Sequence, residues 1–321
     1  MTGSYFQTMS KTLQFEVWHT CRNRCKFCYL QGDQETPRLE MIKNIKNVHQ
    51  TIVNKEIWNE YDTVSFIGGE IFQGEMDNEF IQQEWDDLIK TISKYHEDGL
   101  IKKVYFCATL TFDNNDALWH TLSQFNGHRE GVWVLTSYDE EGRFHTPQYL
   151  KNWQENIKKI RNEFVGIKIN TTVICTATVC EKYLEDRDYF NKLRGLGTQL
   201  FLKVPSRPKL YKTNKEANEK MGINFFPTRK LFMNFLIKLA NEDINLYEKL
   251  CDIDLRADTL IGKWKDKDFV STRDKSTYME LYDDETEYVM KCGHISTYNA
   301  YLDENGCVLC DIQAVKDMVN G

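Results

Sequence analysis

Short β-rich segments that alternate with longer helical segments are the feature that most constrains how this chain folds. Strands are predicted at residues 13–18, 63–67, 101–110, 132–136, 167–175 and 199–204. Helices are predicted at residues 39–53, 80–95, 116–125, 147–164, 181–193 and 228–239. Such alternation is typical of a parallel sheet whose strands are joined by crossover helices. These units are too few to close a full barrel, so the sequence predicts an α/β fold, a partial (β/α)6 barrel of the TIM type.

The chain is predicted to have three parts. Residues 1–12 form an N-terminal tail outside the fold, and residues 13–245 form the partial barrel. Residues 246–321 form a small C-terminal metal-binding extension. The boundary is placed there because the composition becomes polar and only weakly periodic. A length of 321 residues fits one barrel-sized domain with an appendage, since a domain usually has about 100–200 residues.

Composition narrows the class of protein. The chain carries 41 basic and 48 acidic side chains, a net charge of −7, and is 41% hydrophobic, which is typical of a globular protein. The acidic balance does not indicate a nucleic-acid partner. No apolar run approaches the ~18–20 residues that cross a bilayer, and no secretory signal is recognised in the first thirty residues. A cytoplasmic location is therefore expected, with the 10 cysteines reduced.

Three cysteines follow directly on the first predicted strand. Cys21, Cys25 and Cys28 are separated by three and then two residues. Cysteine thiolates in short runs of this kind hold iron–sulfur clusters. Three ligands on a [4Fe–4S] cluster leave one iron free to bind a molecule that is not protein. The alternative is a structural zinc site, in which His19 supplies the fourth ligand of a tetrahedron.

A Gly-Gly-Glu sequence follows the second predicted strand. Gly68 and Gly69 permit a close approach to the backbone, and the carboxylate of Glu70 is suited to receive an ammonium group. The alternative interpretation is an ordinary turn. The position of this sequence one strand–helix unit after the cysteine triplet favours a binding role.

The triplet C-x3-C-x2-C, with the aromatic Phe27 before its last cysteine, resembles the signature of the radical S-adenosylmethionine (radical SAM) enzymes. The resemblance implies that the triplet lies on the loop after the first strand of a partial (β/α)6 barrel and binds a [4Fe–4S] cluster. It also implies that the free iron chelates the amino and carboxylate groups of S-adenosylmethionine. In that family, the Gly-Gly-Glu element contacts the methionine amino group, which implies cofactor contacts for Phe27, Gly68, Gly69 and Glu70.

Polar residues on two later strands give a weaker signal. Ser137 directly follows the fourth predicted strand and Asn170 lies on the fifth, where the resemblance implies contacts to the cofactor. The alternative for each is an ordinary strand-end cap or an interior polar group with its own partners. Lys203 and Arg207 are suited to bind a substrate anion, although solvated surface charges are the more common case.

A second set of metal-ligating residues lies near the C-terminus. Cys292 and His294 are followed, after twelve intervening residues, by Cys307 and Cys310. These four residues have the paired short spacings of a structural zinc site, and the turn at residues 303–306 would join two strands of a hairpin. The alternatives are an auxiliary iron–sulfur cluster, with Cys251 as an extra ligand, or no metal. Cys107, Cys175 and Cys180 are predicted to be buried thiols without a role.

Together these features predict an enzyme. As the resemblance implies, it would cleave S-adenosylmethionine reductively at the [4Fe–4S] cluster and use the 5′-deoxyadenosyl radical to abstract a hydrogen atom. The substrate is unidentified: a peptide, a modified nucleotide or a small metabolite. A flavodoxin- or ferredoxin-like protein would supply the electron, and no catalytic residue is assigned. The rival functions are a non-catalytic zinc-binding interaction protein and an iron–sulfur electron carrier, neither of which needs Glu70 behind two glycines.

Overall fold

The structure is a computed structural model that describes residues 12–23, 25, 36–128, 130–140, 142–203 and 229–250, and four short strands nearer the C-terminus. Contacts between Cα atoms divide the chain into two units. Unit 1 contains Met1–Arg24, Gly32–Thr136 and Tyr149–Asn170. Unit 2 contains Cys25–Gln31, Ser137–Gln148 and Thr171–Gly321.

The six predicted strands form one sheet. The strands are β1 (Thr12–Glu16), β2 (Thr63–Ile67), β3 (Lys103–Cys107), β4 (Val132–Tyr138), β5 (Ile167–Ile174) and β6 (Gln199–Lys203). Their order in the sheet is β1-β2-β3-β4-β5-β6, and the strands run parallel. In a doubly wound fold the strand order reverses partway across the sheet, whereas here it follows the chain. The predicted α/β fold with partial-barrel strand order is therefore confirmed.

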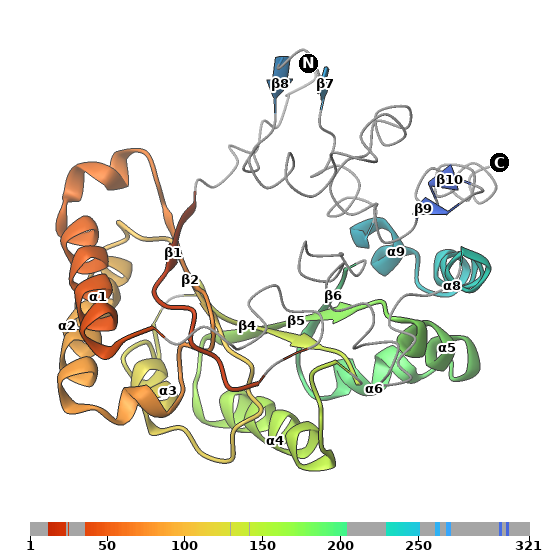
Figure 1. Ribbon diagram of the computed structural model, residues 1–321, viewed down its shortest axis with the longest axis horizontal. Helices are drawn as coiled ribbons and strands as arrows, with labels where there is room; N and C mark the ends of the chain where they lie inside the picture. The colour runs from red at the N-terminus through yellow and green to blue at the C-terminus, as the bar shows by residue number, and fades with distance from the viewer. Residues whose placement is uncertain are drawn as a thin grey trace. The chain divides into compact units, whose positions relative to one another are not determined.

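Helices connect the strands. They are α1 (Arg38–Val53), α2 (Glu79–Glu97), α3 (Asp116–Ser123), α4 (Pro147–Glu163), α5 (Ala177–Glu185), α6 (Tyr189–Gly195), α8 (Arg229–Glu242) and α9 (Ile244–Leu250), with short 3-10 helices at Lys55–Asn59 and Gly74–Asp77. In unit 1, α1 and α2 pack side by side (Figure 1). None of the helices in the described parts of the chain is long and apolar enough to cross a membrane.

One predicted helix was wrong. Residues 181–193 were expected to form a single helix, but α5 begins at Ala177 and ends at Glu185, and α6 begins only at Tyr189. The backbone of Asp186 is extended, with φ −120 and ψ 109, and its Oδ1 accepts a hydrogen bond from the Asp188 N–H at 2.9 Å. Aspartate side chains compete with the helical hydrogen bonds in this way, which explains the interruption.

The core of unit 1 is aromatic. The Phe66 and Phe106 rings of neighbouring strands are stacked with centroids 5.6 Å apart. Trp85 of α2 contacts Phe66 edge to face, with centroids 5.3 Å apart. All three side chains are fully or almost fully buried. Burial of such large apolar groups holds α2 against β2 and β3, so the loops after these strands start from rigid elements.

Two pairs of short strands are described nearer the C-terminus. Strands β7 (Ile261–Lys263) and β8 (Asp268–Val270) pair antiparallel, as do β9 (Leu302–Asp303) and β10 (Gly306–Cys307). The second pair lies on either side of the predicted turn, of which residues 304 and 305 are outside the described residues. Cys251, Cys292, His294 and Cys310 lie outside the described residues, and only the backbone of Cys307 is described. The second metal site and the domain boundary at residue 245 therefore stay predictions.

Candidate functional site

The Gly-Gly-Glu turn after β2 forms hydrogen bonds with the backbone segment that leads into the cysteine triplet. The Gly69 N–H donates to the Trp18 carbonyl at 2.8 Å, and the Glu70 N–H donates to the Thr20 carbonyl at 3.0 Å. In return, Trp18 Nε1 donates to the Glu70 carbonyl at 3.0 Å. These bonds hold the residue before Cys21 against the end of β2.

The two glycines are required by this close approach. Gly68 has a φ of +133, and a Cβ there would lie 2.3 Å from the Trp18 carbonyl oxygen. A Cβ at Gly69 would lie 2.1 Å from the Thr20 oxygen and 2.5 Å from the His19 oxygen. We expected a ligand to approach this backbone. In the structure, the atoms that approach it are the protein's own carbonyl groups, so the glycines position the segment that carries Cys21.

Glu70 is a buried carboxylate with a defined orientation. The residue is only 4% exposed. Its Oε1 accepts a hydrogen bond from the Phe72 N–H at 3.0 Å, and its Oε2 accepts one from the Thr109 N–H at 2.6 Å. Each oxygen of a carboxylate can accept more than one hydrogen bond, so these two bonds fix the orientation of the group and still allow a ligand to donate to it.

Two further contacts tie the cysteine loop to neighbouring loops. Gln73 Nε2 donates to the Thr20 carbonyl at 2.7 Å. Thr111 Oγ1, on the loop after β3, donates to Asn23 Oδ1 at 2.9 Å. Asn23 lies between the first two cysteines of the triplet, so the loops after β1, β2 and β3 meet at one place. This is the carboxyl-terminal edge of the sheet, where ligands of α/β proteins bind.

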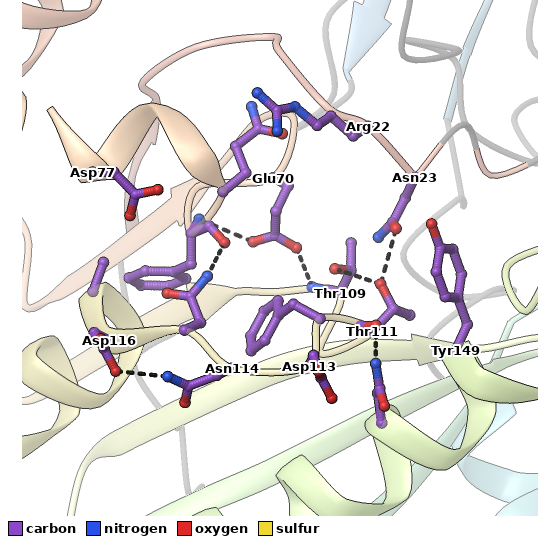
Figure 2. Close-up of a pocket in the computed structure, with 16 residues that line it drawn as sticks. Arg22, Asn23, Glu70, Asp77, Thr109, Thr111, Asp113, Asn114, Asp116 and Tyr149 are labelled. Carbon is purple, nitrogen blue, oxygen red and sulfur yellow. Dashed lines mark hydrogen bonds between the residues drawn. The ribbon is translucent and has the colours of Figure 1, made fainter.

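A cavity of about 450 Å³ opens at this place. Figure 2 shows Glu70 and Asn23 on its wall together with charged residues from other loops. Four carboxylates and one guanidinium line it: Glu70, Asp77, Asp113, Asp116 and Arg22. Small-molecule sites usually have volumes of about 300–1,000 Å³, and the excess of carboxylates favours a ligand that carries positive charge.

The structure describes two of the three predicted cluster ligands. Cys21 is 8% exposed and Cys25 is 5% exposed, and neither is in a disulfide. Cys28 and Phe27 lie outside the described residues, and within the described part of the chain no three metal-ligating side chains converge. His19, the alternative zinc ligand, directs Nε2 to Glu16 Oε1 at 3.0 Å. The cluster site therefore stays a prediction.

Ser137 and Asn170 lie on the strands where they were predicted. Ser137 is half-buried near the end of β4 in unit 2. Asn170 is half-buried on β5 in unit 1, and its Oδ1 is buried without a hydrogen-bond partner among the described residues. Buried acceptors in folded proteins nearly always have a donor, so this oxygen is an exception within the described residues.

Sequence reasoning missed the residues that hold the loop after β3. Asn152 and Asn156 of α4 are 5% and 4% exposed, and their side chains bond to the carbonyls of this loop. A signal was present, because both asparagines fall on the same helix face as the buried Trp153 and Ile157. A buried asparagine within an apolar helix face needs a hydrogen-bond partner. A neighbouring loop is the natural source of such a partner.

Cys180 is a buried thiol. It is fully buried, and its Sγ contacts the Cys175 carbonyl at 3.8 Å. Burial raises the pKa of the Cys180 thiol well above its usual range, so the reactive thiolate is absent at pH 8. We expect iodoacetamide at pH 8 to leave Cys180 unmodified in the folded protein and to modify it in urea, as measured by peptide mass spectrometry. Rapid alkylation in the folded protein would contradict this.

Comparisons with known proteins assign no family to this chain. No protein-family model and no curated protein matches the chain. A similar solved structure is that of a histidine-tagged protein described as "anSMEcpe with bound AdoMet", with 17% identity and a TM-score of 0.48. The alignment covers 75% of this chain and 62% of that chain, so this chain spans less than two thirds of that structure.

Proposed function

We propose that this chain is a radical SAM enzyme. The observation that carries the proposal is the buried carboxylate of Glu70. It lies behind two glycines, and the N–H groups of Gly69 and Glu70 donate hydrogen bonds to the segment that enters the C-x3-C-x2-C triplet. A zinc-binding interaction protein or an electron carrier has no use for an oriented carboxylate at this position.

The chemistry of the candidate residues fits the two cofactors. Cys21, Cys25 and Cys28 would hold a [4Fe–4S] cluster, since thiolates are the ligands of such clusters. S-adenosylmethionine carries an ammonium and a sulfonium group, which suits Glu70 and the acidic cavity beside it. The acceptor atom of Asn170 offers a further contact. When bound, the two cofactors supply a 5′-deoxyadenosyl radical that abstracts a hydrogen atom from the substrate.

The proposed reaction also needs an electron donor and a substrate, and the chain has a second predicted metal site. The electron would come from an external flavodoxin- or ferredoxin-like protein, and the enzyme would act in the cytoplasm. Cys292, His294, Cys307 and Cys310 would bind zinc or an auxiliary iron–sulfur cluster. The substrate would be a peptide, a modified nucleotide or a small metabolite.

Metal analysis separates this proposal from its rivals. We expect protein reconstituted anaerobically with iron and sulfide to hold about four irons per chain in the triplet site, and to bind S-adenosylmethionine in equilibrium dialysis. A zinc-binding interaction protein would hold two equivalents of zinc and no iron. An electron carrier would hold iron but bind no S-adenosylmethionine. Either of these results would overturn the proposal.

Glu70→Gln tests the cofactor contact. The variant keeps the size of the side chain, removes its charge, and replaces one acceptor oxygen with an NH2 group that leaves the N–H of Phe72 or Thr109 without its acceptor. We expect S-adenosylmethionine to bind about 10- to 100-fold more weakly, because a hydrogen bond to a charged group contributes about 1.5–3 kcal/mol. Iron content should stay at the wild-type value. The matched control is Glu84→Gln on α2, which removes the charge of a side chain that forms an ion pair with Lys46 and should leave binding unchanged. Wild-type binding by Glu70→Gln would contradict the assignment.

A further inference from the structure

Two asparagines of α4 bind three consecutive carbonyl groups of the loop after β3. Asn152 Nδ2 donates to the Thr111 carbonyl at 3.0 Å. Asn156 Nδ2 donates to the Leu110 carbonyl at 3.0 Å and to the Phe112 carbonyl at 2.8 Å. An amide nitrogen carries two N–H groups, so Asn156 uses both of them on this loop. The asparagines lie one helical turn apart, on a face that is buried.

The loop that they bind has an unusual backbone. Leu110 has a φ of 58, and it is the one residue other than glycine with a positive φ in the described parts of the chain. It is also fully buried. A bulky side chain in this left-handed conformation costs about 1–3 kcal/mol and persists only when surrounding contacts impose it. Here the contacts are the bonds from Asn152 and Asn156 to the carbonyls at and after Leu110.

The residues on either side of Leu110 make the contacts that reach the candidate site. Thr109, before it, donates its N–H to Glu70 Oε2 at 2.6 Å. Thr111, after it, donates Oγ1 to Asn23 Oδ1 at 2.9 Å. Figure 2 shows both contacts converging on the cavity wall. If Leu110 adopted an ordinary conformation, the chain direction would change between these two donors, and both could not keep their acceptors.

We propose that Asn152 and Asn156 are positioning residues for this site. By holding residues 110–112 in a left-handed turn, they set the Thr109 N–H against Glu70 and the Thr111 hydroxyl against the cysteine loop. All of these residues belong to unit 1. The inference rests on the proposed function for the identity of the ligand, while the coupling between α4 and Glu70 is a property of the chain itself.

The test compares two variants, each of which removes the hydrogen bonds that one asparagine donates to the loop. Asn156→Leu keeps the approximate volume and removes two donors, and Asn152→Leu removes one. The matched control is Ser93→Ala, because Ser93 Oγ also donates to a backbone carbonyl of another element, that of Gln124, at 2.7 Å in unit 1. Each variant is measured as the full chain, first by hydrogen exchange of the Thr109 amide without cofactors, and then by S-adenosylmethionine binding after reconstitution.

Positioning predicts a local effect that a loss of stability alone does not produce. We expect exchange of the Thr109 amide to be at least ~10-fold faster in Asn156→Leu, with a smaller increase in Asn152→Leu and none in Ser93→Ala. The dissociation constant for S-adenosylmethionine should rise about 10-fold in Asn156→Leu, with iron content unchanged.

Two results would overturn the inference. The first is a Thr109 amide that exchanges no faster in Asn152→Leu than in Ser93→Ala. This comparison can be made even if Asn156→Leu does not fold. The second is wild-type cofactor affinity in variants whose Thr109 amide does exchange faster. If the wild-type protein binds no S-adenosylmethionine at all, the proposed function fails. The exchange measurement still decides whether the asparagines position the Thr109 N–H that donates to Glu70.

Discussion

Cys21→Ala is expected to remove the iron–sulfur cluster. Only two cysteines of the triplet would remain, and a cluster that already has one iron without a protein ligand does not survive the loss of another thiolate. Iron per chain after anaerobic reconstitution should fall from about four to less than one at this site, with loss of the visible absorbance. Formation of 5′-deoxyadenosine should fall to background.

The control for this variant is Cys180→Ala. Cys180 is buried, as Cys21 and Cys25 are, but lies outside the motif, so its loss should leave iron content and cofactor cleavage at wild-type values. Iron that remains in Cys21→Ala and disappears on further replacement of Cys292 would assign an auxiliary cluster to the C-terminal set. Full iron content and cleavage in Cys21→Ala alone would contradict the assignment of the triplet.

Gly69→Ala is expected to be severely destabilising although it adds one methyl group. The new Cβ would lie 2.1 Å from the backbone oxygen of Thr20 and 2.5 Å from that of His19. Backbone atoms cannot rotate away as a side chain can, so the end of β2 and the segment before Cys21 must separate. Overpacking usually costs about 1–3 kcal/mol, and more where backbone must move. We expect a loss of about 3 kcal/mol or more in urea unfolding, together with poor cluster retention.

Gly195→Ala supplies the comparison. Gly195 ends α6, and a Cβ there would meet no atom within 4 Å. Alanine is favoured over glycine in a helix by about 0.5–1 kcal/mol, so this variant should be neutral or slightly more stable. If Gly69→Ala were as stable as Gly195→Ala and still held its cluster, the close packing of the glycine turn against residues 18–20 would be refuted.

The strand–helix pattern was predictable because it depends on local sequence. Strand β2 was predicted at the residues where it occurs, since a buried parallel strand reads as an apolar run and the glycine pair marks its end. Strand β4 extends two residues beyond its predicted end, to Tyr138. The break between α5 and α6 was not predicted, because it depends on which way the Asp186 side chain turns.

The candidate site was predictable only in part. Glu70 was recognised from its position behind two glycines, but the sequence does not show that carbonyl groups of residues 18–20 fill the space that the glycines leave. The contacts from Asn156 to the Leu110 loop join residues 46 and 44 positions apart. Such tertiary contacts leave no periodic signal in the sequence. The left-handed backbone conformation of Leu110, and the two asparagines that bind its loop, were therefore found only in the structure.

The most direct test of the central claim is product analysis by liquid chromatography. The reconstituted protein is reduced with dithionite under anaerobic conditions and incubated with S-adenosylmethionine. A radical SAM enzyme is predicted to release 5′-deoxyadenosine and methionine in equal amounts, and to do so only when both the cluster and the reductant are present. Intact S-adenosylmethionine after incubation with reduced, cluster-loaded protein would contradict the account.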